Sequence, residues 1–314
     1  MTEKIIKDFS IIIPVYCNEG SLVELYSQLE KKVFQENINY SGDVIFCDDG
    51  SSDKSFEVLM KLKTHNDNIK IIRLSRNFGQ TAAIYAGLSI SKSKSYIIIS
   101  ADLQDPVELI NDFLDLNRNH NHEIVIGVRS ARSDPIFSRI TASIAFWLMK
   151  KVNFDNFPGG GFDFVLISER IKNILLDRYD SNPFWQGEIL WTGFKPKFIK
   201  YKRISRAHGV SKWSISKKIT YFIDGVLGFS FLPIRLMSLC GLIIASSGFI
   251  YAIYILFARI FTFGEMAFGW APLMIVILLI GGFQMLFLGI MGEYIWRTLS
   301  QTRERPNYII KEIS

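Results

Sequence analysis

The sequence predicts an α/β domain with a mostly parallel sheet, followed by a hairpin of two membrane-spanning helices. The first half of the chain alternates apolar runs of strand length with segments of helical periodicity, which is typical of a sheet covered by helices on both faces. Beyond about residue 230, two apolar segments exceed the roughly 20 residues needed to cross a bilayer. They extend from Leu236 to Phe257 and from Ala271 to about Ile295.

Five apolar runs in the first half are rich in β-branched or aromatic residues and are expected to be strands. They are Ile11 to Val15, Val44 to Phe46, Ile69 to Leu74, Tyr96 to Ile99 and Ile124 to Val128. Segments with a helical apolar period lie between the first four runs. They are Leu22 to Phe34, Phe56 to Leu62 and Thr81 to Ile90.

These patterns divide the chain into four parts. Residues 1–214 form the α/β domain, and residues 236–296 hold the two transmembrane helices. Residues 215–235 read as an interfacial amphipathic segment, because the charged residues Lys217, Lys218 and Asp224 occur there with the aromatic residues Tyr221 and Phe222 before the first span. Residues 297–314 are expected to be a cytoplasmic tail.

The distribution of basic residues predicts the orientation in the membrane. From Lys195 to Lys218 the chain carries many Lys and Arg and neither Asp nor Glu, whereas the loop between the spans carries one Arg and one Glu. The positive-inside rule therefore places both termini and the large domain in the cytoplasm. No signal peptide is expected, because the run Ile11 to Ile13 is short and follows charged residues.

Composition narrows the classes of partner. The net charge of +6 is concentrated beside a membrane span, which favours anionic lipid over nucleic acid. The three cysteines are scattered and lack metal-binding spacing, as in proteins of a reducing compartment.

The first candidate site follows the run that ends at Ile99. Asp102 and Gln104 place oxygen donors at the carboxyl edge of the sheet, where ligands of α/β proteins bind. Such donors suit Mg²⁺ or Mn²⁺ carrying a diphosphate. Asp105 has a second reading, since with Pro106 and Glu108 it can instead cap a helix.

Residues at or just after the ends of the other expected strands together predict one nucleotide-diphosphate pocket. The adjacent carboxylates of Asp48 and Asp49 could accept hydrogen bonds from a base or ribose. Arg76 and Arg129 could bind phosphate. The residues of the predicted pocket are Pro14, Tyr16, Glu19, Asp48, Asp49, Arg76 and Arg129. The chain has neither a GxxxxGK[ST] nor a GxGxxG motif, so ATPase and dehydrogenase readings are weak.

Seven motifs, in order along nearly the whole chain, resemble the family 2 glycosyltransferases that load sugars onto polyprenyl phosphate, most closely the bactoprenol glucosyltransferase type. They are Pro14-Val15-Tyr16, Asp48-Asp49-Gly50-Ser51, Leu74 to Gly79, Ala101 to Pro106, Gly209 to Trp213, Leu288 to Tyr294 and Arg305 to Tyr308.

The resemblance implies a GT-A fold, a UDP-sugar donor such as UDP-glucose, a polyprenyl (undecaprenyl) phosphate acceptor and a bacterial inner-membrane, multi-pass location. It implies a divalent cation near Asp102 and Gln104 and uridine contacts around Asp49, with Ser100 and Ala101 beside the donor. Asp102, Asp163 and Arg129 would be catalytic, and Arg206, Ser211 and Lys212 would bind the lipid phosphate. Glycines in the second span allow close helix packing and a homo-oligomer such as a tetramer.

The chain departs from the family pattern at three positions. Ser100 stands where the family commonly has Asp, so one acidic contact to donor or metal is missing. Phe162 and Val165 stand where Gly and Arg are common, which suggests altered recognition of sugar or lipid phosphate.

Alternatives to this reading remain open. Asp163 could be only a structural partner for a nearby Arg, and Lys212 could contact headgroups nonspecifically. Rival functions are a noncatalytic membrane scaffold that binds nucleotide-sugar, made plausible by Ser100, and a processive polysaccharide synthase. The synthase reading is weak because residues 186–191 do not supply its Gln-x-x-Arg-Trp motif.

Overall fold

The structure is a computed structural model, and two compact units are distinguished in it: Met1–Gly225 with Glu304–Ser314, and Val226–Arg303. The residues that it describes are 6–129, 158, 161–177, 180–181, 183–204, 232–261 and 270–314.

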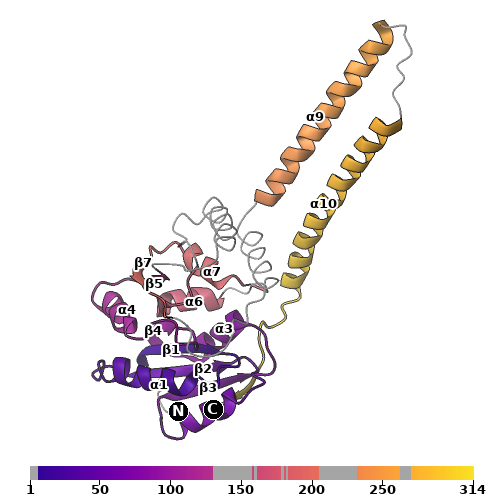
Figure 1. The fold of residues 1–314 in the computed structure, drawn as a ribbon. Helices are drawn as coiled ribbons and strands as arrows, with labels where there is room; N and C mark the ends of the chain where they lie inside the picture. The colour runs from indigo at the N-terminus through magenta and orange to yellow at the C-terminus, as the bar shows by residue number, and fades with distance from the viewer. Residues whose placement is uncertain are drawn as a thin grey trace. The chain divides into compact units, whose positions relative to one another are not determined.

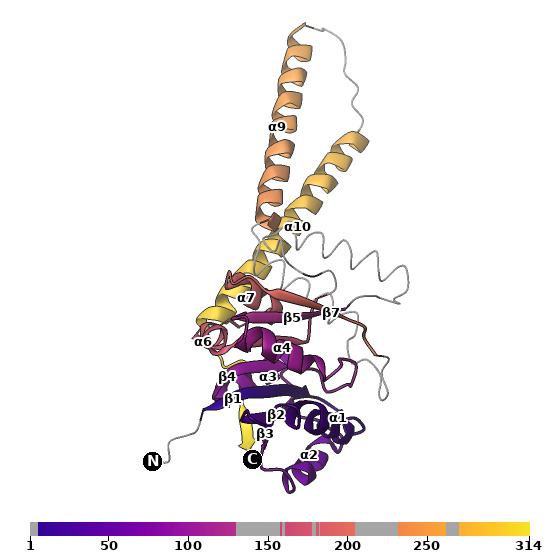
Figure 2. The same cartoon turned by 90° about the vertical axis from the view of Figure 1, so that its left-hand side faces the viewer.

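The first unit contains a mixed eight-stranded sheet in the order β7-β5-β6-β4-β1-β2-β3-β8. Figures 1 and 2 label β7, β5, β4, β1, β2 and β3, which follow one another in this order. Strands β1 to β4, β5 and β7 run in one direction, and β6 and β8 run antiparallel to their neighbours. The strands are β1 (Lys7–Val15), β2 (Gly42–Asp48), β3 (Ile69–Leu74), β4 (Ser93–Ile98), β5 (Ile124–Arg129), β6 (Val165–Ser168), β7 (Lys197–Tyr201) and β8 (Ile310–Ile313).

All five expected strands are confirmed, with ends that differ by up to four residues. The three expected helices are also present, but the first ends earlier than predicted and continues as a π-helical segment, η1. The helices of this unit are α1 (Leu22–Leu29), η1 (Glu30–Phe34), α2 (Ser55–Lys63), α3 (Gln80–Ile90), α4 (Leu109–Arg118), α6 (Glu169–Asp177) and α7 (Trp185–Trp191).

The apolar core lies on both faces of the sheet because successive strand side chains alternate between them. Ile11 and Ile13 of β1 belong to one buried cluster with α1, α2 and α4. The intervening Ile12 meets α3 on the opposite face, at Gly87. Helix α3 is almost wholly buried, which explains its run of small and apolar residues.

Gly87 sets the distance between α3 and the sheet. A Cβ at this position would lie 2.6 Å from Cγ2 of Ile12 and 2.8 Å from Sγ of Cys47, so the helix would have to move outward. We expect Gly87→Ala to lower the free energy of unfolding by about 1–3 kcal/mol, because overpacking outweighs the gain in helix propensity. Thermal unfolding of the purified protein measures this.

Gly241→Ala, at a helical site where a Cβ meets no protein atom within 4 Å, is the matched control for that substitution. An unchanged or raised unfolding temperature for Gly87→Ala would contradict the close packing of α3.

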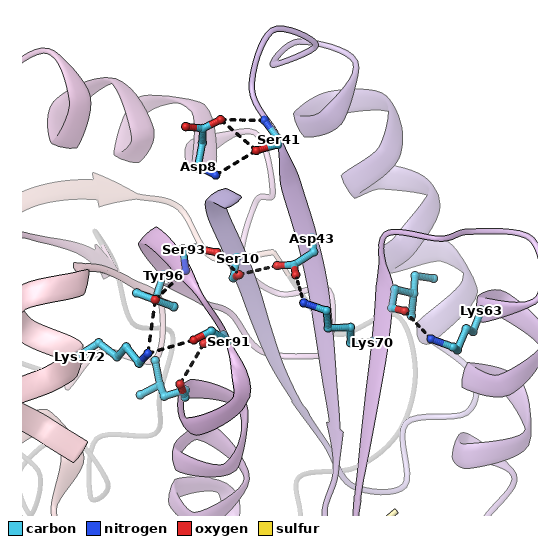
Figure 3. Close-up of polar contacts among 12 residues, drawn as sticks. Asp8, Ser10, Ser41, Asp43, Lys63, Lys70, Ser91, Ser93, Tyr96 and Lys172 are labelled. Carbon is cyan, nitrogen blue, oxygen red and sulfur yellow. Dashed lines mark hydrogen bonds and ion pairs between the residues drawn. The ribbon is translucent and has the colours of Figure 1, made fainter. Parts of the chain in front are cut away.

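A buried polar network crosses the amino-terminal ends of β2, β1 and β4 (Figure 3). The Ser10 hydroxyl donates to Asp43 and lies 2.5 Å from the Ser93 hydroxyl, and Lys70 donates to Asp43 at 2.5 Å. Lys172 of α6 donates to the carbonyl of Ser91 at 3.0 Å. Because every one of these groups has a partner, their burial is compensated, and this edge of the sheet is occupied by structural contacts.

The C-terminal residues, which are expected to be a cytoplasmic tail from residue 297 onward, include a strand of the sheet. Ile310–Ile313 form β8, which pairs antiparallel with β3. The Ser314 N–H donates to the Ile71 carbonyl at 2.8 Å, and Asn307 donates to the Asp180 carbonyl at 2.6 Å. The end of the chain is therefore part of the α/β unit.

The second unit contains helices α9 (Leu232–Phe261) and α10 (Trp270–Thr302). Each has a stretch long and apolar enough to cross a membrane, Pro233–Tyr251 and Leu279–Thr302. Both helices extend past the expected bounds, 236–257 and 271–295. Glu293 pairs with Arg297 one turn later at 3.1 Å. Residues 215–231 of the expected interfacial segment lie outside the described residues.

Candidate active site

The carboxyl ends of β4, β1, β2 and β3 are neighbours in the sheet, so the loops that follow them share one edge. Two hydrogen bonds tie these loops together. The Cys17 N–H after β1 donates to the Ser51 hydroxyl after β2 at 3.0 Å, and the Ser21 hydroxyl donates to the Ala101 carbonyl after β4 at 2.6 Å. The structure thus brings the expected donor-binding segments to one place.

Asp49 links the loops after β2 and β3. Its two carboxylate oxygens accept hydrogen bonds from the backbone N–H groups of Phe78 at 2.7 Å and Gly79 at 2.9 Å. The residue is only 2% exposed. Asp49 therefore holds the loop after β3 in place, a structural task that its sequence position alone did not indicate.

The turn after Asp49 requires glycine. Gly50 has φ +66°, and a Cβ there would lie 2.6 Å from the backbone carbonyl carbon of Arg76. Asp48 is fully buried, accepts from the Ser51 N–H at 3.1 Å and lies 3.5 Å from Nε of Arg73. Both adjacent carboxylates thus have structural partners, and this corner of the site is a close contact between two loops.

The other expected donor residues differ in exposure. Pro14 is buried within β1, and Tyr16 is partly exposed just after it. Glu19 is exposed and accepts from the Lys54 N–H at 3.0 Å. Arg76 is exposed, and its guanidinium lies 4.1 Å from the centre of the Phe78 ring. Tyr16, Glu19 and Arg76 are thus accessible to a ligand.

The loop after β4 carries the expected metal-binding pair. Ser100 is partly exposed, Ala101 is buried, and Leu103 has a left-handed backbone with φ 57° between Asp102 and Gln104. Asp102 Oδ1 accepts the Gln104 N–H at 3.3 Å, and Oδ2 lies 3.7 Å from Nη2 of Arg203. Carboxylate and amide oxygens two residues apart fit the ligand preference of Mg²⁺ or Mn²⁺.

Asp105 does not cap the following helix. Helix α4 begins at Leu109, and its N-cap position is Glu108. Asp105 is instead buried and accepts a hydrogen bond from the Tyr201 hydroxyl on β7. Burial raises the pKa of Asp105, and the hydrogen bond from Tyr201 opposes that rise. The helix-cap prediction is therefore wrong, because a partner from a distant strand binds the carboxylate.

Arg129 and Asp163 form an ion pair, with Nη2 of Arg129 2.7 Å from Oδ2 of Asp163. Asp163 Oδ1 lies 3.5 Å from Nε2 of Gln186, and Arg129 also interacts electrostatically with Tyr201. Burial lowers the pKa of Arg129, but the charges of Asp163 and Asp105 outweigh it, so the pKa lies above its ordinary value. The predicted Arg partner of Asp163 is thus Arg129.

The two apolar departures from the family pattern lie in the core beside this pair. Phe162 is buried with its ring centre 5.7 Å from that of Trp185, and Val165 is buried at the start of β6. The Gln186 amide donates to the Phe162 carbonyl. Packing, rather than a polar pocket, occupies both positions.

Three residues of the site were not predicted: Tyr201, Arg203 and Gln186. Each of these residues is separated by more than 20 positions in the sequence from the residue that it contacts, which is Asp105 for Tyr201, Asp102 for Arg203 and Asp163 for Gln186. The only sequence signal was the basic run that begins at Lys195, which was assigned to lipid. The expected lipid-phosphate residues Arg206, Ser211 and Lys212 lie outside the described residues.

The chain is similar to known glycosyltransferases over nearly its whole length. Residues 10–169 match the model of the family "Glycosyl transferase family 2". A putative glycosyltransferase, CsbB, of Bacillus subtilis is 37% identical over 96% of this chain and 91% of its own length. A prophage bactoprenol glucosyl transferase homolog of Escherichia coli is 31% identical over 97% of this chain and 98% of its own. The bactoprenol glucosyl transferase of Shigella phage SfV is 31% identical over 96% and 97%.

Among solved structures, glucosyl-3-phosphoglycerate synthase of Mycobacterium tuberculosis, in complex with Mn²⁺, UDP-glucose and phosphoglyceric acid, superposes with a TM-score of 0.52 at 14% identity. That match covers 69% of this chain and 76% of the other. It identifies the fold of the first unit as GT-A. With the family match and the near full-length relatives, it follows that this chain is a glycosyltransferase and belongs to glycosyl transferase family 2.

Proposed function

We propose that the protein transfers a sugar, with inversion, from a UDP-sugar such as UDP-glucose to polyprenyl (undecaprenyl) phosphate. The observation that carries this proposal is the linkage of two groups at the carboxyl edge of the sheet. The oxygen donors Asp102 and Gln104 adjoin Asp105, which accepts a hydrogen bond from Tyr201 and feels the charges of the Arg129–Asp163 ion pair. Relatives named bactoprenol glucosyl transferase support the polyprenyl acceptor and glucose as the first sugar to test.

A divalent cation, Mg²⁺ or Mn²⁺, fits the donor set at Asp102 and Gln104. In the described ranges no three His, Cys, Asp or Glu side chains form a metal-binding group, so diphosphate oxygens and water would complete the coordination. When bound, such a cation supplies charge stabilisation for the departing diphosphate. A structural neighbour holds Mn²⁺ together with UDP-glucose, which supports the same pairing here.

The chain's own residues supply orientation and charge. A polyprenyl monophosphate is anionic at neutral pH and needs no strong general base to attack the anomeric carbon. Asp163, held by Arg129, would orient the acceptor or stabilise positive charge that develops on the sugar ring. Arg129 and Arg76 would offer positive charge to the phosphates.

The remaining donor contacts are proposed on their positions around the same edge. They are Pro14, Tyr16, Glu19, Asp48, Asp49, Ser100 and Ala101. Because Asp49 already accepts two backbone hydrogen bonds, its contribution to nucleotide binding would be to shape the loop at Phe78 and Gly79.

The acceptor is proposed to reach the site from the membrane. Arg206, Ser211 and Lys212 would bind its phosphate, and the helices α9 and α10 would anchor the enzyme as a two-span protein of the bacterial inner membrane. The basic run before α9 supports a cytoplasmic catalytic unit and cytoplasmic termini. A homo-oligomer, such as a tetramer, would be built through glycines of α10.

The test is an assay of the purified full-length protein with Mg²⁺ or Mn²⁺, undecaprenyl phosphate and a panel of UDP-sugars. UDP release and the mass of a glycolipid are followed together. We expect one UDP-sugar to give both signals, and omission of the lipid to abolish the glycolipid. UDP-sugar binding without a glycolipid for any donor would contradict the proposed reaction.

Ser100 favours a second candidate, a noncatalytic scaffold that binds nucleotide-sugar. Ser100 precedes Asp102 by two residues, at a position where the family commonly has a carboxylate. If wild type binds UDP-sugar without turnover, Ser100→Asp distinguishes the two functions. A gain of glycolipid synthesis in that variant would assign the missing activity to the missing carboxylate.

A further inference from the structure

Residues 201–204, at and just after the end of β7, contact residues 102–105, in the loop that follows β4. The Tyr201 hydroxyl donates to Asp105, the Ile204 N–H donates to the Gln104 carbonyl at 3.0 Å, and the Gln104 amide donates to the Ile204 carbonyl at 3.2 Å. Arg203 lies between these anchors, with Nη2 3.7 Å from Asp102 Oδ2. Because Tyr201 and Ile204 are fixed by hydrogen bonds, the position of Arg203 beside Asp102 is determined by the fold.

The contact between Arg203 and Asp102 is close in space but poor in hydrogen bonding. The side chains are 29% and 12% exposed, so water screens their charges only partly. The separation of 3.7 Å is well beyond the roughly 2.7–2.9 Å of a charge-assisted hydrogen bond. Nε of Arg203 is buried and makes no hydrogen bond within the part of the chain that the structure describes. The guanidinium therefore has donor capacity that a better-placed anion would use.

A divalent cation and the Arg203 guanidinium would compete for the carboxylate of Asp102. A cation at Asp102 and Gln104 would lie within a few ångströms of the guanidinium, and like charges at that range repel. A bound nucleoside diphosphate would turn this repulsion into a net attraction, because its negatively charged oxygens accept hydrogen bonds from guanidinium donors in bidentate geometry.

We infer that Arg203 is the counter-ion of Asp102 before the donor binds, and that its guanidinium turns to the diphosphate when cation and nucleotide bind together. The inference rests on the proposed function, since it takes UDP-sugar as the donor. Arg203 would then weaken binding of the cation alone and strengthen binding of the nucleotide with the cation. The two ligands would bind cooperatively as a consequence.

Two equilibrium measurements on the full-length protein in detergent test this exchange. Binding of Mn²⁺ alone is followed by electron paramagnetic resonance, and binding of UDP at saturating Mn²⁺ by calorimetry. For Arg203→Gln we expect Mn²⁺ alone to bind about fivefold tighter, since a repelling charge is removed. We expect UDP with Mn²⁺ to bind about tenfold weaker, since a charge-assisted contact is lost.

Two further variants separate charge from geometry. Arg203→Lys keeps the positive charge, so Mn²⁺ alone is expected to bind within about twofold of wild type while UDP binds more weakly. Lys202→Gln removes the same charge from the neighbouring exposed position and is expected to leave both affinities unchanged. Circular dichroism shows whether each variant is folded. If Arg203→Gln is unfolded, the inference is tested with Arg203→Lys instead.

The outcomes distinguish this inference from the proposed function. If wild type binds Mn²⁺ and UDP, the proposed function survives this test. If Arg203→Gln then binds both ligands as wild type does, or binds Mn²⁺ more weakly, only the inferred role of Arg203 is refuted. If Arg203→Gln is unfolded, UDP binding by Arg203→Lys as tight as that of wild type refutes it equally. Wild type that binds neither Mn²⁺ nor UDP refutes both proposals.

Discussion

Asp102→Asn is expected to lower the rate of sugar transfer by about 10³-fold, with little change in folding, because it removes the carboxylate charge from the proposed cation site. The replacement keeps the shape of the side chain and an oxygen that can accept the Gln104 N–H. Arg203 would lose its anionic neighbour, but at 29% exposure it remains partly hydrated. Initial rates of glycolipid formation, measured over a range of Mn²⁺ concentrations, give the size of the loss.

Asp67→Asn is the matched control for that substitution, because Asp67 lies in an exposed turn before β3 and undergoes the same chemical change. We expect its transfer rate to stay within about twofold of wild type. An Asp102→Asn enzyme that retains more than a tenth of the activity at saturating Mn²⁺ would exclude Asp102 as the main cation ligand. The cation would then have to be assigned to other donors of the same sheet edge.

β1 to β5 could be predicted because most of their residues are buried and each contains a run rich in Ile, Val or Phe. β6 is also buried and apolar from Val165 to Ile167, but it is only four residues long and escaped prediction. β7 escaped prediction because it is an edge strand with lysines at 197 and 200, a composition that protects edges but resembles a loop. β8 is four residues long and pairs with a strand more than 230 residues earlier, so nothing local marks it.

The candidate site also has a part that could be predicted from the sequence and a part that could not. Residues that follow predicted strands, such as Asp49 and Asp102, could be placed at one edge because parallel strands end together. What these side chains contact could not be read from the sequence. Asp105 looked like a helix cap because the local spacing permits it, yet Tyr201, 96 residues later, binds its carboxylate. Burial of that carboxylate favours a hydrogen-bonding partner across the sheet over an exposed cap.

Asp163→Asn separates a role at the reaction centre from a role as a structural partner of Arg129. The two side chains are 31% and 16% exposed, so loss of the charge leaves Arg129 partly solvated and costs limited stability. If Asp163 stabilises charge on the sugar or orients the acceptor, kcat is expected to fall by about 10²–10³-fold. The thermal unfolding midpoint is expected to fall by less than about 5 °C.

Asp43→Asn is the control for that substitution, because we expect it to lower stability and leave kcat nearly unchanged. Asp43 is 2% exposed, accepts from Ser10 and pairs with Lys70 at the amino-terminal ends of the strands (Figure 3). Its loss of charge is expected to lower the unfolding midpoint by more than that of Asp163→Asn, because the carboxylate is more buried, while kcat stays within about twofold. If both variants lose activity only in proportion to the fraction unfolded, Asp163 acts solely by holding Arg129. A fall in kcat confined to Asp163→Asn, at a temperature where both variants are folded, assigns the carboxylate to the transfer step itself.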